Sequence, residues 1–261
     1  MALASWVQGL AEARSDPIVR RATIALPNWP RSARPIRVAL LSDIHVGSAS
    51  TTPARLARVV ALTDALHPDL VLIAGDFLNG YRPIARDRSL RLLAPLASLK
   101  APLGVIAVLG NHDYWTGETA LRSDFARLGV TLLANQVLRV GPLAVGGVSD
   151  SITKHNKDWI VYSKLRKLMG ARVVLTHSPE IAPWLPTDIT LMLAGHTHCG
   201  QIRLPIVGSI DPMVDFRGYR CGVVRNGNRL TIITAGIGTT TLPIRLGAPP
   251  DMWLLTLGPP A

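Results

Sequence analysis

Nine polar side chains able to bind metal ions or exchange protons lie at the ends of apolar segments of the 261-residue chain. They include five of the seven histidines, and the full set is Asp43, His45, Asp76, Asn111, His112, Asp113, His177, His196 and His198. Carboxylates, imidazoles and an amide oxygen together suit divalent ions such as Mn, Fe, Zn, Co and Ni. The two cysteines, Cys199 and Cys221, provide no thiolate cluster, so a structural zinc site is disfavoured.

The spacing within two of these groups predicts that paired side chains act together. In Asp43-x-His45 and in His196-x-His198, the alternation of a strand end points both side chains to the same side. The two imidazoles of the second pair could then serve two neighbouring cations. Two like charges held close together need a bridging carboxylate, and Asp76 is the acid available at its strand end. Each group alone is a common sequence, but all of them in order predict a dinuclear metal site.

The segments before these residues alternate between predicted strands and helices. Strands that end at the polar positions are predicted at 36–41, 70–74, 105–109, 171–175 and 189–193. Helices are predicted at 53–66, 87–99, 116–128 and 156–169. Further strands are predicted at 131–133, 137–140, 143–148, 219–225, 229–234 and 252–257, with a hairpin turn at 226–228. This order favours βαβ units and two packed sheets with helices outside.

The first 35 residues are predicted to be an extension that precedes a main domain at 36–261. Apolar residues recur at helical spacing within residues 2–13, namely Leu3, Trp6, Val7 and Leu10. Residues 27–35 are Pro-rich and basic, which is typical of a connector. A helix of the kind predicted at 2–13 more often packs on its own domain, and the alternative is an anionic membrane surface, for which an apolar stripe followed by arginines is typical.

No run of about 18 apolar residues is present, and no normal signal peptide is recognisable. Neither absence settles the location, and we expect a cytoplasmic one, either free or on the inner membrane face. The formal net charge of +11 favours anionic partners, although a plain solvated basic surface is an equally good interpretation. Aromatic residues make up only 5% of the chain and the basic residues are scattered, so a nucleic-acid partner is not expected.

Together, the motifs resemble those of the calcineurin-like metallophosphoesterases over about residues 36–258. The segments 36–43, 195–205 and 236–245 are most similar to the bacterial branch of small, membrane-associated phosphoesterases. This resemblance implies an α/β fold, a four-layer αββα sandwich of two mixed β-sheets flanked by helices. Cys199 departs from that branch, which usually has glycine there. We expect a small buried residue, with a thiol that binds metal or oxidises as the alternative.

The resemblance also implies a role for each polar side chain. One ion would be held by Asp43, His45, Asp76 and His198. The other would be held by Asp76, Asn111, His177 and His196, with Asp76 bridging. His112 would stay off the metals and face the substrate as a catalytic residue, oriented by the second catalytic residue, Asp113. The implied cofactors are two divalent transition metal ions, Mn, Fe or Zn.

The implied function is hydrolysis of phosphate ester or pyrophosphate bonds by a metal-bridging hydroxide, because two ions about 3.5–4 Å apart lower the pKa of a shared water. We expect the substrate to be a phosphate-containing small molecule or a lipid-linked compound, with a UDP-2,3-diacylglucosamine-type pyrophosphate as the leading candidate. The alternatives are a soluble phosphomonoesterase or phosphodiesterase on small esters, a nuclease, and a non-catalytic scaffold on the same fold. The loops 79–87, 149–158 and 211–219 neighbour the strand ends and could shape the pocket.

Overall fold

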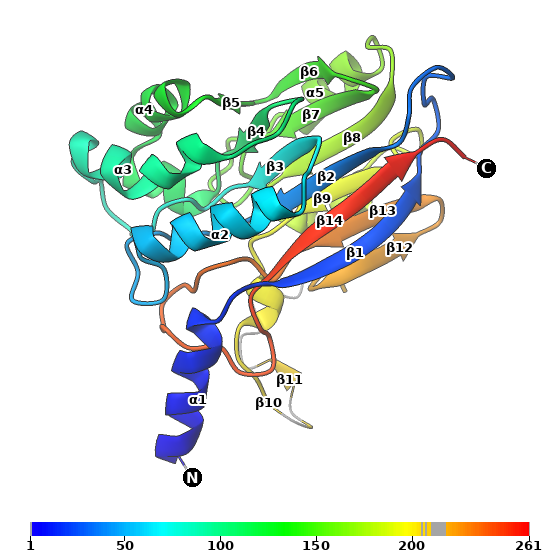
Figure 1. Cartoon of the computed structure of the whole chain (residues 1–261). Helices are drawn as coiled ribbons and strands as arrows, with labels where there is room; N and C mark the ends of the chain where they lie inside the picture. The colour runs from blue at the N-terminus through cyan, green and yellow to red at the C-terminus, as the bar shows by residue number, and fades with distance from the viewer. Residues whose placement is uncertain (1, 205, 207, 210–217, 261) are drawn as a thin grey trace.

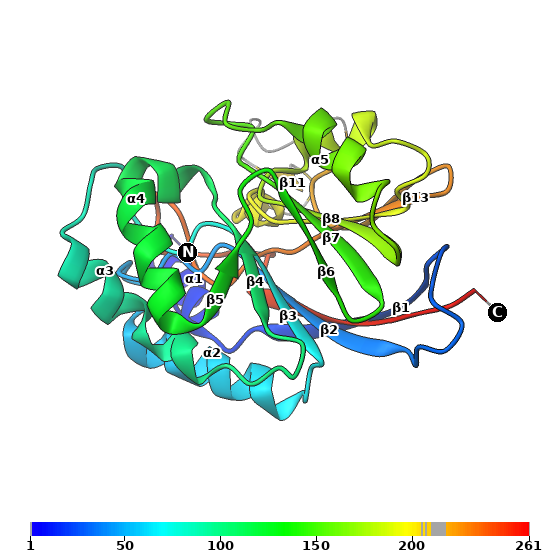
Figure 2. The ribbon, with the colours of Figure 1, turned by 90° about the horizontal axis from the view of Figure 1, so that it is seen from above.

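The computed structural model describes residues 2–204, 206, 208–209 and 218–260. Two six-stranded mixed sheets pack face to face with helices outside, which is the predicted four-layer αββα arrangement (Figure 1, Figure 2). In spatial order, the first sheet contains β1 (Ile18–Ala25), β14 (Asp251–Gly258), β2 (Ile36–Leu41), β3 (Leu70–Ala74), β4 (Val105–Val108) and β5 (Val130–Leu132). The second sheet contains β12 (Gly222–Asn226), β13 (Arg229–Ile233), β9 (Leu191–Ala194), β8 (Ala171–Thr176), β7 (Leu143–Val148) and β6 (Gln136–Val140).

Helices form the two outer layers. The first sheet is covered by α2 (Pro53–Ala65), α3 (Arg86–Leu93), the 3-10 turn η1 (Ala94–Ser98) and α4 (Asn111–Leu128). The second sheet is covered by α5 (Asp158–Leu165) and η2 (Pro179–Trp184). The helix α1 (Ala2–Arg14) projects from one end of the sandwich, the end that also carries η3 (His198–Gly200), β10 (Arg203–Leu204) and β11 (Gly208–Ser209) (Figure 1). Most of the loop predicted at 211–219 lies outside the described residues.

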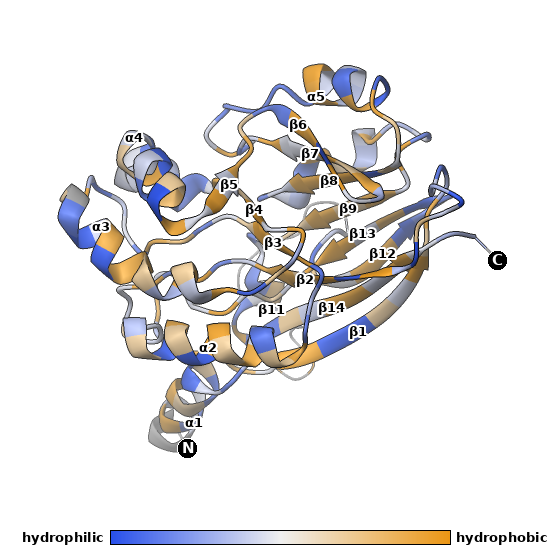
Figure 3. Cartoon of the chain, turned by 45° about the horizontal axis from the view of Figure 1, so that its top comes forward, coloured by the Kyte–Doolittle hydropathy of each residue, from blue (hydrophilic) through white to orange (hydrophobic). Residues whose placement is uncertain are grey.

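The strands divide their side chains between two apolar layers, as a period of two requires. In β2, Val38 and Leu40 point between the two sheets, whereas Ala39 and Leu41 pack under the helices. Both faces of the central strands are therefore buried, and Figure 3 shows these strands as largely hydrophobic. This double burial explains why continuous apolar runs predict them correctly.

A local signal explains where the helix α2 begins, but the start of α4 was predicted wrongly. The side chain of Thr52 accepts a hydrogen bond from the backbone N–H of Arg55 (3.2 Å), and Pro53 occupies the first helical position of α2. By contrast, α4 begins at Asn111, five residues before the predicted start, and bends at Gly117, where φ is 126°. The predicted site residues 111–113 therefore lie in the first turn of a helix.

Residues 18–25 form a strand that the sequence analysis did not predict. This strand, β1, pairs in parallel with β14, and Arg20 Nε lies 2.5 Å from Asp251 Oδ2. After it, Leu26 and Trp29 enter the apolar layer between the sheets. Because β1 is an edge strand with one face open to water, its sequence mixes arginines with apolar residues and does not look like a buried strand. The segment assigned to an extension thus contributes a strand and core residues to the sandwich.

Candidate metal centre

The predicted ligands meet at one end of the sandwich, where strands of both sheets terminate. In the first sheet, Asp43 follows β2, Asp76 follows β3, and Asn111 opens α4 after β4. In the second sheet, His177 follows β8, and two more histidines follow β9. Eight of the nine predicted site residues are buried, and His196 is partly exposed. The structure therefore brings together residues that are spread over more than half of the sequence.

The Asp76 carboxylate lies between two groups of imidazoles. Its Oδ2 atom is 3.4 Å from His45 Nε2 and 3.3 Å from His177 Nε2. On the His45 side, His198 Nε2 is 3.2 Å from His45 Nε2 and 3.5 Å from Asp43 Oδ1. Burial raises the pKa of the Asp43 carboxyl to about 7, and a cation at this point would favour its ionised form. The four residues of the first implied ligand set thus converge.

The second group surrounds His177. Its Nε2 atom is 3.0 Å from Asn111 Oδ1 and 3.1 Å from His196 Nδ1. Its Nδ1 atom lies 2.7 Å from the carbonyl oxygen of Ala74, which can only accept a hydrogen bond. A neutral His177 therefore keeps its proton on Nδ1 and directs the lone pair of Nε2 to the centre, which is the arrangement of a metal ligand.

The protonation chemistry of these side chains fits divalent cations. Burial lowers the pKa of His45 and His196 to about 3, so both imidazoles are neutral and can offer a lone pair. Burial acts to raise the pKa of Asp76, but the neighbouring imidazoles, His177 foremost, hold that pKa below its usual range. Burial likewise opposes the charge of His177, but the Asp76 carboxylate outweighs it and raises the pKa of His177 to about 10. The Asp76 carboxylate thus favours positive charge at this point, which a divalent cation would supply.

Five of the predicted ligands have backbone in the left-handed region, which is uncommon for residues other than glycine. The φ angles are 49° at Asp43, 46° at His45, 56° at Asp76, 70° at His196 and 48° at His198. Strain of this kind costs about 1–3 kcal/mol at each residue and concentrates at functional sites. Close packing holds these conformations: a Cβ atom on Gly110 would collide with Asp76, and one on Gly195 would collide with Asp43.

The resemblance implied that Asp113 orients His112, but the carboxylate of Asp113 is engaged elsewhere. Its carboxylate instead accepts hydrogen bonds from four backbone N–H groups, those of Asp76 (2.8 Å), Phe77 (2.9 Å), Leu78 (3.3 Å) and Gly110 (3.0 Å). Burial and the nearby charge of Asp76 raise the pKa of Asp113 to about 7. Because Asp113 lies in the first turn of α4, its side chain turns back toward the loop after β3. It holds the turn that presents Asp76.

Asp113→Ala is expected to lower the free energy of unfolding by about 2–4 kcal/mol, because buried N–H groups lose their acceptor. Asp113→Asn should cost less, since one side-chain oxygen can still accept. Urea unfolding in the presence of chelator measures both variants without a contribution from metal. An Asp113→Ala variant with unchanged stability and a reduced rate would restore the orienting role that the resemblance implied.

His112 is held by groups from two other segments. Its Nδ1 atom lies 2.8 Å from the carbonyl oxygen of Gly80 and therefore donates to it, while Nε2 lies 3.3 Å from Thr240 Oγ1. The backbone N–H of His112 donates to Asp76 Oδ1 (2.9 Å), and the His112 ring lies 4.8 Å from the His45 ring. Nε2 is thus the atom that can exchange a proton with a bound substrate.

Arg245 belongs to the centre, but the sequence analysis gave it no role and included it only as the end of the segment 236–245. Its side chain is fully buried, and Nη2 lies 3.2 Å from Nδ1 of His198. The guanidinium donates to five backbone carbonyl groups, those of Ala235 (2.6 Å), Gly238 (2.6 Å), Ala248 (2.8 Å), Gly236 (3.2 Å) and His198 (3.5 Å). Burial lowers its pKa to about 10, so it stays charged at neutral pH. The one signal in the sequence is a charged residue within an apolar, Pro-containing segment.

Cys199, which directly follows His198, forms a disulfide with Cys221. Cys199 is buried, as expected, and its thiol is oxidised, which was the alternative, but the sequence analysis did not predict Cys221 as its partner. The bond ties the turn that carries His198 to the chain just before β12. The two cysteines are 22 positions apart and form no recognisable spacing pattern. The sequence therefore does not show that they come together in the fold.

Replacing both cysteines with alanine is expected to lower the free energy of unfolding by about 2–4 kcal/mol, because the crosslink restricts the unfolded chain. Urea unfolding with and without a thiol reductant measures this effect. Reduction should destabilise the wild-type protein by a similar amount and leave the double variant unaffected. Equal stability of the oxidised, reduced and alanine forms would show that the disulfide does not stabilise the fold.

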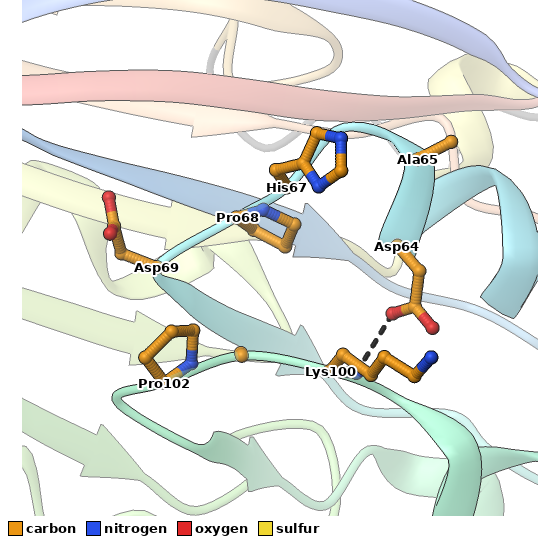
Figure 4. A pocket seen from close by; sticks show the side chains of 8 residues that line it. Asp64, Ala65, His67, Pro68, Asp69, Lys100 and Pro102 are labelled. Atoms are coloured by element: carbon orange, nitrogen blue, oxygen red, sulfur yellow. Dashed lines mark hydrogen bonds between the residues drawn. The ribbon is translucent and has the colours of Figure 1, made fainter.

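A hollow of about 710 Å³ lies at the opposite end of the first sheet, between α2 and β3 (Figure 4). Its two acids already have partners. Asp64 accepts a hydrogen bond from the backbone N–H of Lys100 (2.8 Å), and Asp69 accepts from Arg37 N–H (2.7 Å) and Arg34 Nη2 (2.8 Å). None of the predicted ligands lines this hollow, so it is separate from the metal centre.

The family model described as calcineurin-like phosphoesterase matches residues 36–200, which is more than half of the chain. This chain belongs to the calcineurin-like phosphoesterase family. All seven predicted metal ligands lie inside the matched range. In the described part of the chain, no helix has both the length and the apolar character needed to cross a membrane.

Relatives of this calcineurin-like phosphoesterase occur in animals and bacteria. One from Caenorhabditis elegans is 30% identical over 95% of this chain and 54% of its own length. An uncharacterized metallophosphoesterase of Aquifex aeolicus is 28% identical and is matched over 92% of this chain and 91% of its own length. A solved structure, a dimetal phosphatase from Danio rerio, is 14% identical, with a TM-score of 0.48 over 78% of this chain and 88% of that one. The chain thus spans about half the length of the nematode relative.

Proposed function

We propose that this calcineurin-like phosphoesterase hydrolyses phosphate ester or pyrophosphate bonds with two divalent transition metal ions, Mn, Fe or Zn. The observation that carries this proposal is the position of Asp76, whose carboxylate contacts both His45 and His177. Two such ions supply hydroxide at neutral pH and neutralise phosphoryl oxygens. His112 would protonate the leaving oxygen through Nε2, because Gly80 engages its other ring nitrogen.

The purified protein should contain close to two transition metal ions per chain, and chelation should abolish hydrolysis of a nitrophenyl phosphate ester. Atomic emission measures the metal content, and activity is compared before chelation, after it, and after each metal is added back separately. Full activity in excess chelator would contradict the proposal. Two bound ions without hydrolysis of any phosphate ester would favour the non-catalytic scaffold.

We also propose that the substrate is amphiphilic, a lipid-linked pyrophosphate of the UDP-2,3-diacylglucosamine type, taken from an anionic membrane surface. Exposed apolar side chains at the end of the sandwich that carries α1 support this proposal, namely Trp6, Val7, Leu204 and Ile206. Exposed arginines accompany them, Arg14 on α1 and Arg203 on β10. Apolar side chains beside basic ones are typical of a protein that lies on an anionic leaflet.

This apolar end is connected to the metal centre by backbone hydrogen bonds. The N–H of Arg245 donates to the carbonyl oxygen of Gly9 on α1 (3.0 Å), and the N–H of Arg203 donates to that of Leu246 (2.7 Å). The segment around Arg245 therefore joins α1 and β10, and Arg245 also contacts the predicted ligand His198. A lipid held at this end would place its phosphate near the ligands.

The test uses substitutions, because removing residues 1–35 would remove the strand β1. Vesicles that contain anionic lipid should pellet the full chain in low salt, and should pellet a Trp6→Ser, Val7→Ser double variant much less. Trp159→Ser, an exposed tryptophan on α5, is the matched control. The lipid-linked compound should be hydrolysed with a higher kcat/KM than its water-soluble head group. No vesicle binding and no lipid preference would favour a soluble phosphomonoesterase or phosphodiesterase on small esters.

A further inference from the structure

Two large, solvent-exposed aromatic rings lie beside His112. Tyr81 belongs to the loop after β3, and Trp115 belongs to the first turns of α4, just before the bend at Gly117. Tyr81 is 57% exposed and Trp115 is 38% exposed. Their rings are stacked, with centroids 5.5 Å apart and an angle of 25° between the planes. Together they form a flat aromatic surface, which we call the aromatic wall.

The aromatic wall contacts the catalytic histidine directly. The ring of Tyr81 lies 4.7 Å from the ring of His112, and that of Trp115 lies 5.0 Å from it. Both contacts are angled, at 58° and 65°, so neither ring covers the face of His112 in parallel. A group attached to the oxygen that His112 protonates would therefore lie next to the aromatic wall.

Hydrogen bonds hold the Tyr81 ring of the wall in place, and Trp115 stacks on that ring. The hydroxyl of Tyr81 lies 3.3 Å from the hydroxyl oxygens of both Thr240 and Thr241. Thr240 in turn is held by Gln201, which accepts from its N–H (3.0 Å) and donates to its carbonyl oxygen (3.0 Å). A ring that is already held in position loses little conformational freedom when a ligand binds to it. The Tyr81 half of the aromatic wall is thus arranged before any ligand arrives.

We propose that Tyr81 and Trp115 bind a flat aromatic group, such as a nucleobase, carried by the leaving group, which is the alcohol of a phosphate ester or the nucleoside phosphate of a pyrophosphate. This inference rests on the proposed hydrolysis. In the step concerned, an oxygen from water joins phosphorus, the bond from phosphorus to the leaving oxygen breaks, and that oxygen receives a proton from His112. Aromatic stacking favours a base over a sugar alone, and its usual strength corresponds to roughly 5- to 100-fold in affinity.

The experiment compares two esters that share one phosphoryl group and differ only in the leaving alcohol, uridine or 1-methylribose, each joined through O5′. Trp115→Ala and Tyr81→Ala should each lower kcat/KM for the uridine ester by roughly 5- to 100-fold. Hydrolysis of the methylribose ester should stay within about twofold, and the metal content should not change. Trp115→Phe should retain most of the preference, and Trp159→Ala is the matched control.

Calorimetry with the matching phosphonates, in which a CH₂ group replaces the leaving oxygen, gives a second measurement that needs no turnover. The wild-type protein should bind the uridine compound more tightly than the methylribose compound, and the alanine variants should lose that difference. If the alanine variants lost affinity equally for both compounds, the wall would only support His112. If they lost no affinity for either compound, the wall would not touch the ligand. A wild-type protein that binds with this preference but hydrolyses neither ester would contradict the proposed hydrolysis alone.

Discussion

Asp76→Asn is expected to remove both metal ions and to reduce hydrolysis by roughly 10⁴-fold or more. The Asp76 carboxylate lies between His45 and His177, and the neutral amide of asparagine has no charge to balance two adjacent cations. The side-chain oxygen of asparagine can still accept the hydrogen bond from His112 N–H. The substitution therefore removes the charge of the bridge while it preserves the local fold.

Metal content and thermal unfolding in chelator measure the two consequences separately. Asp188→Asn is the matched control, because Asp188 is paired with Arg166 and Arg172 away from the centre. The control should keep both ions and the wild-type rate. If Asp76→Asn retained two ions per chain and the wild-type rate, the bridging role of Asp76 would be wrong.

His112→Ala is expected to keep both metal ions and to lose about 10²–10⁴ in kcat, which is the usual contribution of a positioned acid. Its Nδ1 atom donates to Gly80 and its Nε2 atom lies near Thr240, so both ring nitrogens have partners outside the predicted ligand set. The experiment could still show that His112 is a metal ligand, because one of its ring nitrogens lies within 4.8 Å of ligand atoms of His45 and Asp76.

The same metal measurement decides the outcome for His112. A variant with two ions and a slow rate separates chemistry from binding, and its rate should fall most for substrates with poor leaving groups, which need protonation most. A variant that loses an ion would show that His112 is a ligand. Thr240→Val, which removes only the hydroxyl near His112 Nε2, should retain both ions and most of the activity.

The family and the layers were predictable from the sequence, and so was the set of residues that meets at the candidate metal centre. Asp43, Asp76 and His177 each follow an apolar run that is buried on both faces. Such a run packs stably only as a central strand, so the polar residue after it must emerge at the end of the sheet. Because parallel strands end at the same edge, motifs that are far apart in the sequence can be assigned to one site.

The contacts that support these residues could be found only in the folded chain. Arg20 reaches Asp251 across 231 positions, and Tyr81 reaches Thr240 across 159, so no local pattern encodes either contact. Asp113 adjoins His112 in sequence, but helical geometry turns its carboxylate to the backbone of the loop after β3. The contact of Arg245 with His198 likewise exists only after folding. Ligand types follow from local chemistry, whereas side-chain directions depend on backbone angles that distant segments impose.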